Sequence, residues 1–207
     1  MDERFSAVLE TYHARIEEER RAYGPAGRLD RGRDRDQLLL AVGPQTGQLI
    51  NILAKSLEAP HILELGTSYG YSTLWLAEAA RATGGRVTTM ELHPGKSAHA
   101  REKVAEAGLA EHVDFQVGDA LKLIEALPGR IDFVLVDLWK DLYLPCLERF
   151  APKLNRGAIL VADNIIRPGG EGVLAYLRAV RAMPKMRSLM LPVGSGLEIS
   201  RFEGGPG

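Results

Sequence analysis

The sequence predicts an α/β fold with a doubly wound, mostly parallel sheet, and three observations support this prediction. Short apolar runs alternate with helical patterns over most of the chain. Some runs, such as residues 133–136, lack a strict polar alternation, which is typical of strands covered on both faces. Glycine-bearing turns separate the segments, as expected where helices end. Alternating elements with buried strands favour a parallel sheet with helices on both sides.

The N-terminal part predicts two helices. The first is expected to be amphipathic because apolar residues recur at helical spacing: Phe5, Val8, Leu9, Tyr12 and Ile16. A second helix is predicted over residues 44–57, and Pro60 marks its end. We expect residues 1–57 to form a helical cap on a core of residues 58–207. A chain of 207 residues suits one such domain.

The core is expected to contain seven strands. Five should form the parallel part of the sheet, at residues 61–65, 86–91, 113–117, 131–136 and 157–162. Helices are predicted between and after them, at residues 70–83, 95–107, 119–126, 141–154 and 171–182. Two extended runs, 186–192 and 197–202, flank a short glycine turn. This pattern predicts a C-terminal antiparallel hairpin.

Composition excludes several classes of partner. With 26 basic and 27 acidic residues the net charge is -1, so no overall field favours nucleic acid or an anionic membrane. The charged run at 28–36 contains both signs and is interpreted as a solvated loop. The single cysteine, Cys146, lies in an apolar helical pattern and is expected to be buried filler. No export signal or roughly 20-residue apolar span is visible, so we expect a soluble, cytoplasmic protein.

Oxygen-bearing side chains follow two predicted strands. Asp137 comes directly after the strand at 131–136, and Asp163 and Asn164 follow the strand at 157–162. Ligands of doubly wound sheets bind at such strand ends, and two carboxylates with an amide suit Mg²⁺, while Mn²⁺ or Ca²⁺ also fit. Taken singly, Asp137 is better explained as a helix cap and Asp163 with Asn164 as a turn. Their combination near Lys140, one helical turn past Asp137, favours a cation site.

A glycine turn follows the first core strand. Glu64 lies in this strand, and the turn contains Gly66, Ser68 and Gly70 before a helix that begins near Ser72. Gly66 permits a tight turn and a close approach of a ligand to the backbone. The spacing differs from the dinucleotide fingerprint because Ser68 replaces its second glycine. This replacement counts against NAD and favours a cofactor without a diphosphate.

Two further strand ends carry candidate nucleotide contacts. Glu91 ends its strand, where a carboxylate can accept from both ribose hydroxyls, although a helix cap is an equal alternative. The next strand ends at Gly118, where Asp119 can accept from an adenine amine while the Ala120 amide donates to a ring nitrogen. Asp119 is equally well placed as the N-cap of the following helix, and the two roles can coexist.

In this order, the motifs resemble class I S-adenosylmethionine (SAM) dependent methyltransferases, which have a Rossmann-like seven-stranded sheet. More narrowly, residues 42–201 resemble the cation-dependent O-methyltransferases of the catechol and caffeoyl-CoA type. The motifs that carry this resemblance are Val-Gly-Pro-Gln-Thr-Gly-Gln at 42–48, Leu-Glu-Leu-Gly at 63–66, Gly-Tyr-Ser at 70–72, Asp-Leu-Trp-Lys at 137–140 and Asp-Asn at 163–164. The spacing between Asp137 and Lys140 is nearer to that of the catechol branch.

The resemblance implies a set of site residues. A cation would be held by Asp137, Asp163 and Asn164, and Lys140 would be the general base. SAM would contact Val42, Glu64, Gly66, Ser68, Tyr71, Ser72, Glu91, Leu92, Gly118, Asp119, Ala120, Asp137 and Trp139. Trp139 would pack beside the adenine or else fill core space, whereas Trp75 is expected to belong to the core. A homodimer is possible by the same resemblance.

The implied reaction is methyl transfer to a hydroxyl of a small catechol-like or polyphenolic acceptor. A cation bound to two neighbouring acceptor oxygens favours the ionised hydroxyl, and Lys140 would take the proton. The chain departs from the catechol branch at residues 187–191, which offer no acid to touch the acceptor, and at Ser68, which replaces an aromatic residue. The alternatives are an NAD-linked oxidoreductase, for which Tyr-x-x-x-Lys is missing, and a non-catalytic SAM-binding module.

Overall fold

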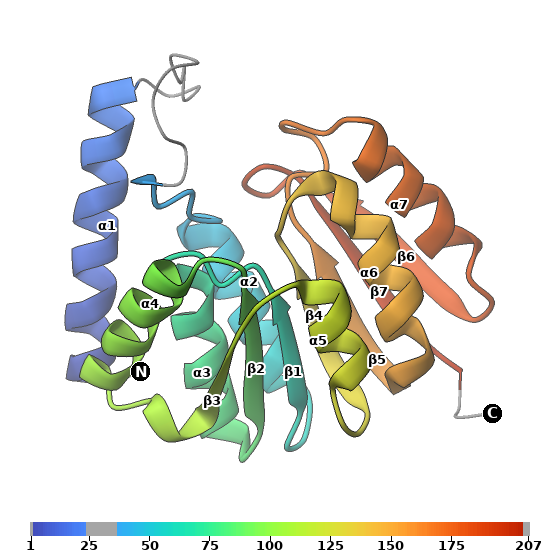
Figure 1. Ribbon diagram of the computed structural model, residues 1–207, viewed down its shortest axis with the longest axis horizontal. Helices are drawn as coiled ribbons and strands as arrows, with labels where there is room; N and C mark the ends of the chain where they lie inside the picture. Colours follow the sequence, from blue (N-terminus) through green and yellow to red (C-terminus); the bar gives the residue numbers. More distant parts are fainter. Residues whose placement is uncertain (1, 24–36, 205–207) are drawn as a thin grey trace.

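A seven-stranded mixed sheet forms the centre of the computed structural model, which describes residues 2–23 and 37–204. The strand order is β3-β2-β1-β4-β5-β7-β6 (Figure 1). The five parallel strands are β1 (His61–Leu65), β2 (Arg86–Glu91), β3 (Val113–Val117), β4 (Ile131–Val136) and β5 (Leu154–Ala162). β6 (Met186–Leu191) and β7 (Leu197–Phe202) run antiparallel to each other, and β7 is antiparallel to β5. The predicted fold class is confirmed.

Seven α-helices connect or cover these strands within the described ranges. They are α1 (Glu3–Tyr23), α2 (Pro44–Lys55), α3 (Tyr71–Thr83), α4 (Pro94–Glu106), α5 (Ala120–Ala126), α6 (Tyr143–Phe150) and α7 (Glu171–Ala182). Short 3-10 turns are η2 (Ala110–His112), η3 (Lys140–Leu142) and η4 (Ala151–Lys153). The charged run predicted to be a loop at 28–36 lies outside the described residues.

One predicted boundary was wrong. We expected a helix over 141–154 and a strand from 157, but α6 ends at Phe150 and β5 already begins at Leu154. Pro152 lies in the next turn and has no N–H to continue an α-helix. The residues between the predicted helix and the predicted strand instead lie in an irregular part of β5. There Ile131 of β4 pairs with Leu154, while Phe133 pairs with Ile159. Gly157, with φ +87°, accommodates the additional residues.

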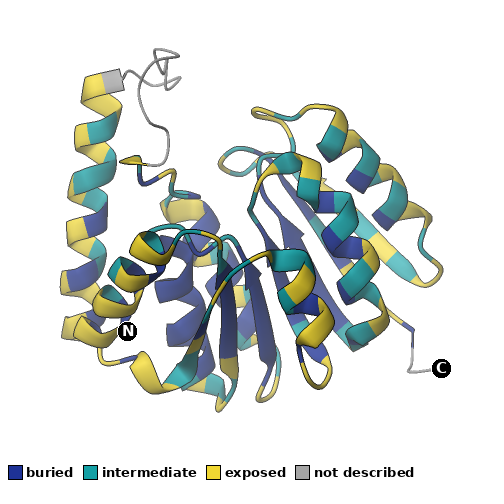
Figure 2. Ribbon diagram, in the orientation of Figure 1, coloured by how far each residue is buried: buried dark blue, intermediate teal, exposed yellow. Residues whose placement is uncertain are grey.

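Two apolar cores lie on opposite faces of the sheet. Buried side chains from α1 to α4 form the first core, and those from α5 to α7 form the second. Successive residues of β1 alternate between them, so Ile62 joins the first core and Leu63 the second. All five residues of β1 are buried, which explains why the central strands read as continuous apolar runs (Figure 2).

Trp75 and Cys146 are both buried, as predicted. Trp75 packs edge-on against Phe5 of α1, with 5.3 Å between the ring centroids. Burial raises the pKa of Cys146 to about 12, which argues against a nucleophilic role. These residues therefore belong to the packing of the domain.

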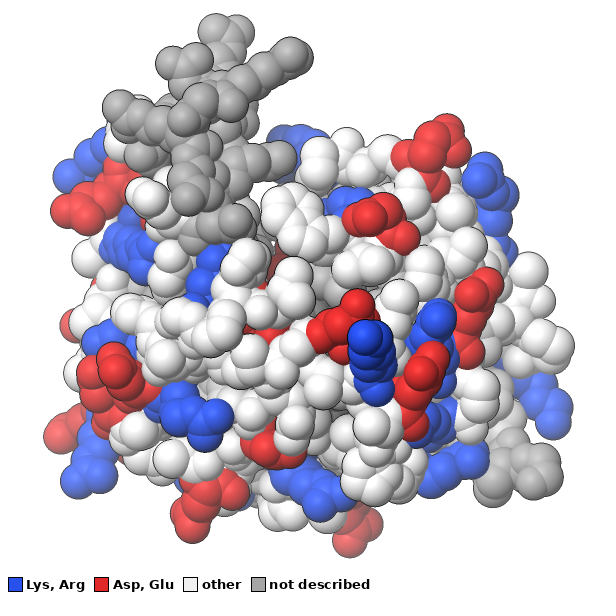
Figure 3. Space-filling model, in the orientation of Figure 1, with Lys and Arg blue, Asp and Glu red and all other residues white. Residues whose placement is uncertain are grey.

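The surface carries no single-sign field on the side that Figure 3 shows. Acidic and basic side chains are interspersed there, in keeping with the net charge of -1. In the part of the chain that the structure describes, no helix combines the length and apolar character needed to cross a membrane.

Candidate functional site

The strand order brings the predicted functional residues to one edge of the sheet. β1, β4 and β5 are parallel neighbours, so their carboxyl ends lie side by side. The backbone ladder continues one residue past each strand, because the amide of Asp137 donates to the Leu65 carbonyl at 2.9 Å and that of Asp163 to the Val136 carbonyl at 3.1 Å. These hydrogen bonds therefore fix the backbone of both aspartates at the ends of their strands, beside the turn that follows β1.

Lys140 lies among the predicted cation ligands. Its Nζ donates to Asn164 Oδ1 at 2.6 Å and lies 3.3 Å from Asp137 Oδ1. Asn164 adopts φ +59°, a left-handed conformation that asparagine tolerates better than most residues. Asp163 is connected to the same amine through Tyr143, whose hydroxyl donates to the Asp163 carbonyl at 3.0 Å and accepts from Lys140 at 2.8 Å. The structure thus brings all four predicted residues together.

Ionisation of the two aspartates is unfavourable in the folded protein. Burial raises the pKa of Asp163, and the neighbouring Asp137 raises it further. Burial also raises the pKa of Asp137, while Lys140 opposes this shift. Asp163 is only 1% exposed, and its Oδ1 has no hydrogen-bond partner among the described residues. A buried, unpaired carboxylate oxygen next to a second carboxylate is a position where a cation fits.

The predicted ligand set is of the hard-oxygen kind. Asp137, Asp163 and Asn164 offer carboxylate and amide oxygens, which suit Mg²⁺, Mn²⁺ or Ca²⁺. Within residues 2–23 and 37–204, no group of three His, Cys, Asp or Glu side chains is arranged to hold a metal ion. The predicted cation site therefore rests on the two carboxylates together with the amide oxygen of Asn164.

The turn after β1 is shaped by positive φ angles. Gly66 has φ +100°, and a Cβ placed on it would overlap the carbonyl of Asp137. Ser68 has φ +47°, and Gly70, at the start of α3, has φ +93°. Gly66 therefore allows the predicted cofactor turn to lie directly against the end of β4, where the oxygen ligands begin.

Glu64 and Ser72 lie beneath this turn. The fully buried Glu64 carboxylate accepts from the Ser72 hydroxyl at 2.6 Å, the Thr73 hydroxyl at 2.5 Å and the Thr89 hydroxyl at 2.6 Å. Burial raises the pKa of Glu64 to about 7, and the three hydroxyl donors oppose this shift. Glu64 thus ties the start of α3 to β1 and β2. Sequence reasoning missed Thr73 and Thr89, because their partner becomes visible only in the folded chain.

Glu91 connects the end of β2 to the same turn. Its Oε2 accepts from the amide of Ser68 at 2.8 Å, and its Oε1 accepts from the amide of His93 at 3.0 Å. Leu92 is exposed beside it. Each carboxylate oxygen keeps a second lone pair, so the predicted contact with ribose hydroxyls stays compatible with this geometry.

Asp119 caps α5, as one of the two readings predicted. Its Oδ1 accepts from the amides of Leu121 at 2.8 Å and Lys122 at 3.3 Å. Gly118 and Ala120 flank it between β3 and α5. The contact of Asp119 and Ala120 with an adenine stays a prediction. The helix cap is compatible with it, because the cap uses only Oδ1 of Asp119 and leaves the other carboxylate oxygen available.

The remaining predicted cofactor residues lie around this edge. Val42 is buried just before α2, and Tyr71 is buried at the first position of α3, with its hydroxyl 3.0 Å from His13 Nε2. Trp139 precedes η3 and is 52% exposed, so the alternative that it fills core space is wrong. Its predicted place beside an adenine agrees with this exposure.

Two loops, at residues 165–167 and 195–196, lie at the same edge of the sheet. They are joined through their backbones, because the Ile165 amide donates to the Gly196 carbonyl at 2.9 Å and the Ile166 amide donates to the Ser195 carbonyl at 3.0 Å. Ile166 and Leu40 are large apolar residues that stay about half exposed. Sequence reasoning missed both, because a single exposed apolar residue produces no recognisable pattern.

Helix α1 also reaches the predicted cofactor turn. Tyr12 donates its hydroxyl proton to the carbonyl of Tyr69 at 2.5 Å, and the Arg15 guanidinium lies 4.3 Å from the centre of the Tyr69 ring. The Glu19 carboxylate accepts from the amide of Leu39 at 2.9 Å. The N-terminal helix is thereby connected to two segments that flank the candidate site.

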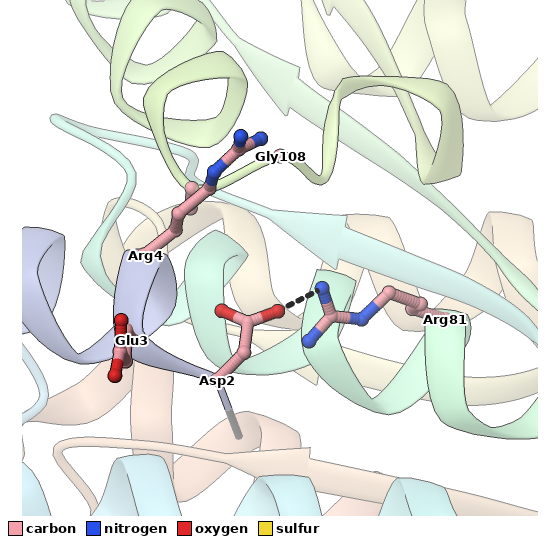
Figure 4. A pocket seen from close by; sticks show the side chains of 6 residues that line it. Asp2, Glu3, Arg4, Arg81 and Gly108 are labelled. Atoms are coloured by element: carbon pink, nitrogen blue, oxygen red, sulfur yellow. Dashed lines mark hydrogen bonds and ion pairs between the residues drawn. The ribbon is translucent and has the colours of Figure 1, made fainter.

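A hollow lies at the opposite edge of the sheet from these residues. It is lined by Asp2, Glu3, Arg4, Arg81, Ala107 and Gly108, and Arg81 donates to Asp2 at 2.7 Å (Figure 4). Arg81 lies near the end of α3, and Gly108 follows the end of α4. Helices that follow parallel strands end at the amino edge of the sheet, so this hollow is remote from the residues described above.

Comparison with known proteins identifies relatives. The family model described as O-methyltransferase matches residues 34–202. A catechol O-methyltransferase of Mycobacterium tuberculosis is 36% identical over 153 residues, covering 73% of this chain and 68% of the relative. A catechol O-methyltransferase of Mus musculus is 35% identical over 144 residues, covering 66% of this chain and 54% of the relative. The caffeoyl-CoA O-methyltransferase 1 of Eucalyptus globulus is 28% identical over 185 residues, covering 79% and 75%.

Solved structures with bound cofactor share the fold. The cofactor-bound protein Rv0187 from MTB superposes with a TM-score of 0.77 at 28% identity, covering 99% of this chain and 92% of that one. The O-methyltransferase TomG from Streptomyces achromogenes, solved in complex with SAM, also gives 0.77, at 26% identity, with 99% and 91% covered. The similarity thus extends over the whole sheet and its helices.

Proposed function

Since this chain belongs to the O-methyltransferase family, of the catechol and caffeoyl-CoA type, we propose that it methylates a hydroxyl of a small catechol-like acceptor in a divalent-cation-dependent reaction, with SAM as donor. The observation that carries the proposal is the meeting of Asp137, Asp163, Asn164 and Lys140 at one edge of the sheet. The glycine turn at Gly66 lies directly against this group.

The donor site is assigned to the strand ends on the other side of Gly66. Glu91 is proposed to accept from the ribose hydroxyls of SAM, and Asp119 with the Ala120 amide to bind its adenine. Trp139, which is exposed at this edge, is proposed to cover the adenine. Glu64 and Ser72 support these contacts from below, because their hydrogen bonds hold the turn and the start of α3.

The cation would be held by oxygens of Asp137, Asp163 and Asn164. Mg²⁺, Mn²⁺ or Ca²⁺ bound there supplies positive charge that favours the ionised form of an acceptor hydroxyl. Oδ1 of Asp163 has no hydrogen-bond partner among the described residues, which supports this assignment, because an unpaired buried carboxylate oxygen costs free energy.

Lys140 is proposed to be the general base. Its neutral amine takes the proton of the acceptor hydroxyl, and the oxygen then bonds to the methyl carbon of SAM. The bond between that carbon and sulfur breaks, and its electron pair stays on sulfur, which becomes a neutral thioether. Holding donor and acceptor in line supplies up to about 7–11 kcal/mol of the barrier reduction. The proton leaves Lys140 for solvent after turnover.

The acceptor is expected to differ in detail from that of the catechol branch. Residues 187–191 carry no acid that could touch an acceptor hydroxyl. Leu40 and Ile166 instead offer exposed apolar surface near the proposed site. We therefore propose an acceptor with an apolar aromatic body, in which the vicinal oxygens provide the polar contacts.

A methyl-transfer screen over dihydroxy-aromatics, with labelled SAM, tests this proposal. We expect turnover of vicinal diols in Mg²⁺, no turnover of matched monohydroxy compounds, and loss of turnover in EDTA. The Asp137→Ala variant should lose more than the roughly 10- to 100-fold that loss of a supporting residue costs at metal sites. The exposed neighbour Asp141 provides the control, because Asp141→Ala should keep wild-type rates.

Turnover that survives both EDTA and Asp137→Ala would refute cation dependence. Binding of SAM without transfer to any acceptor would favour the non-catalytic module. The oxidoreductase alternative conflicts with the family assignment, and calorimetry should detect binding of SAM but none of NAD.

A further inference from the structure

Tyr143 is a buried side chain that the proposed mechanism leaves unexplained. It is the first residue of α6, fully buried, and its ring packs edge-on against Tyr176 with 5.6 Å between the centroids. The Lys140 amine lies 4.7 Å from the centre of the Tyr143 ring and 2.8 Å from its hydroxyl oxygen. Tyr143 therefore touches the proposed base along both its ring and its polar end.

The hydrogen bonds of Tyr143 have a fixed direction. The Asp163 carbonyl, 3.0 Å away, can only accept, so the phenolic proton must point toward it. A lone pair of the same oxygen consequently faces Lys140, which donates an N–H to it. Because both the charged and the neutral amine carry N–H groups, this contact persists in either form. It also leaves the lone pair of the neutral amine free to take a proton.

Four oxygens surround the Lys140 amine. Two of them, Asp137 Oδ1 at 3.3 Å and Asn164 Oδ1 at 2.6 Å, belong to the proposed cation ligands. The others are the Leu138 carbonyl at 3.0 Å and the Tyr143 hydroxyl at 2.8 Å. A cation bound by Asp137 and Asn164 would occupy these two oxygens, which would then no longer accept from the Lys140 amine. Tyr143 then provides the one side-chain contact of this group that still holds the amine in place.

We propose that Tyr143 is a positioning residue that holds the amine of Lys140 beside the cation ligands through its carbonyl-oriented hydroxyl. The proposal rests on the proposed function, in which Lys140 takes the acceptor proton. Tyr143 touches neither donor nor acceptor in this scheme, and it acts only through Lys140.

Tyr176 offers a matched control for the test. It is also a fully buried tyrosine in the same core, but its hydroxyl has no hydrogen-bond partner among the residues that the structure describes. Tyr143→Phe and Tyr176→Phe thus remove the same atom from neighbouring rings. We expect Tyr143→Phe to lower kcat about 10- to 100-fold, the scale of a misplaced catalytic group, with KM for SAM within about twofold of wild type. Tyr176→Phe should leave both constants unchanged.

A double-mutant cycle separates positioning from a general structural effect. In the Lys140→Gln background, Tyr143→Phe should change the residual rate by less than about twofold, because its effect acts through the missing amine. Equal losses in both backgrounds would overturn the proposal. So would wild-type kcat in Tyr143→Phe, or a fall in kcat matched by Tyr176→Phe.

Crystal structures of both variants give a readout that does not depend on turnover. In Mg²⁺-soaked crystals of Tyr143→Phe, we expect the Lys140 amine to leave hydrogen-bond distance of the Leu138 carbonyl. In Tyr176→Phe it should stay in place. An unmoved amine in Tyr143→Phe would refute the positioning role even if the wild type methylates catechols. Absence of any methyl transfer by the wild type, with the amine displaced as expected, would refute the proposed function alone.

Discussion

At the scale of single residues, Asp163 combines deep burial, a carboxylate neighbour and an oxygen without a hydrogen-bond partner in the described chain. Because its folded-state pKa is raised above the ordinary value of 3.8, the folded protein binds this proton more tightly than the unfolded chain does. The free energy of unfolding must therefore fall as the pH rises above that value. A cation that binds the carboxylate should remove this loss.

Asp163→Asn should accordingly stabilise the cation-free protein. In EDTA at pH 8 we expect the free energy of unfolding to rise by about 1–3 kcal/mol, because a buried carboxyl group whose ionisation is opposed by burial and by Asp137 is replaced by a neutral group of the same shape. Mg²⁺ should stabilise the wild type but not the variant. Denaturant unfolding at several pH values, with and without Mg²⁺, measures both effects.

Asp141→Asn serves as the control for this experiment, because Asp141 is exposed and neighbours the site without belonging to it. It should leave stability and the Mg²⁺ response unchanged. A variant Asp163→Asn that is less stable than wild type in EDTA at pH 8 would contradict the assignment of Asp163 as a carboxyl group whose ionisation destabilises the fold.

At the scale of elements, close backbone contacts determine where helices can lie. Gly172, the second residue of α7, lies so near Lys140 that a Cβ would overlap the Lys140 carbonyl. The start of α7 is therefore packed directly against the turn that carries the proposed base. A displacement of α7 should therefore also move that turn.

Gly172→Ala should destabilise the protein by about 1–3 kcal/mol through overpacking, and it should lower kcat because the turn that carries Lys140 must shift. Gly95, in the first turn of α4, is the matched control, since a Cβ there would meet no described atom within 4 Å. Gly95→Ala should be neutral or stabilise by up to about 1 kcal/mol. Chemical denaturation and steady-state rates test both variants, and equal behaviour of the two would contradict the contact.

The sequence predicted the strands well because central strands are buried on both faces, which leaves continuous apolar runs. It failed at residues 151–157, where Pro152 ends α6 early and Gly157 lies in a strand irregularity instead of a turn. Such an irregularity depends on the partner strand and leaves no local pattern.

The candidate site was predictable only in part, for the same reason. Asp137, Asp163 and Asn164 were recognised because each follows an apolar strand. Thr89 and Tyr143 were not, since a threonine within a strand and a tyrosine at a helix start are ordinary residues in the sequence. Their partners, Glu64 and Lys140, are identified by folded geometry.

At the scale of the whole molecule, α1 connects the chain's N-terminal part to the site. Tyr12 holds the carbonyl of Tyr69, and Glu19 holds the amide of Leu39, so one helix contacts both flanks of the proposed donor site. Binding of SAM should order these flanks and, through them, α1. This coupling should be visible in amide hydrogen exchange.

We expect SAM to slow exchange in α1, and Tyr12→Phe to weaken SAM binding about 2- to 10-fold, which corresponds to one net hydrogen bond. Thr11→Ala is the control, because Thr11 is exposed and bonds only within its own helix. Calorimetry and exchange mass spectrometry provide the readouts. Unchanged exchange in α1 at saturating SAM would show that the helix does not respond to the donor.

The pairing of the loops at residues 165–167 and 195–196 has a consequence for how this enzyme could diversify. The loops are joined by main-chain amides and carbonyls, which every residue except proline supplies in full. Exchange of side chains such as Ile166 and Ser195 therefore leaves the pairing intact. A small combinatorial library at these positions should change which acceptors of the proposed kind are methylated, while the proposed donor site stays unchanged.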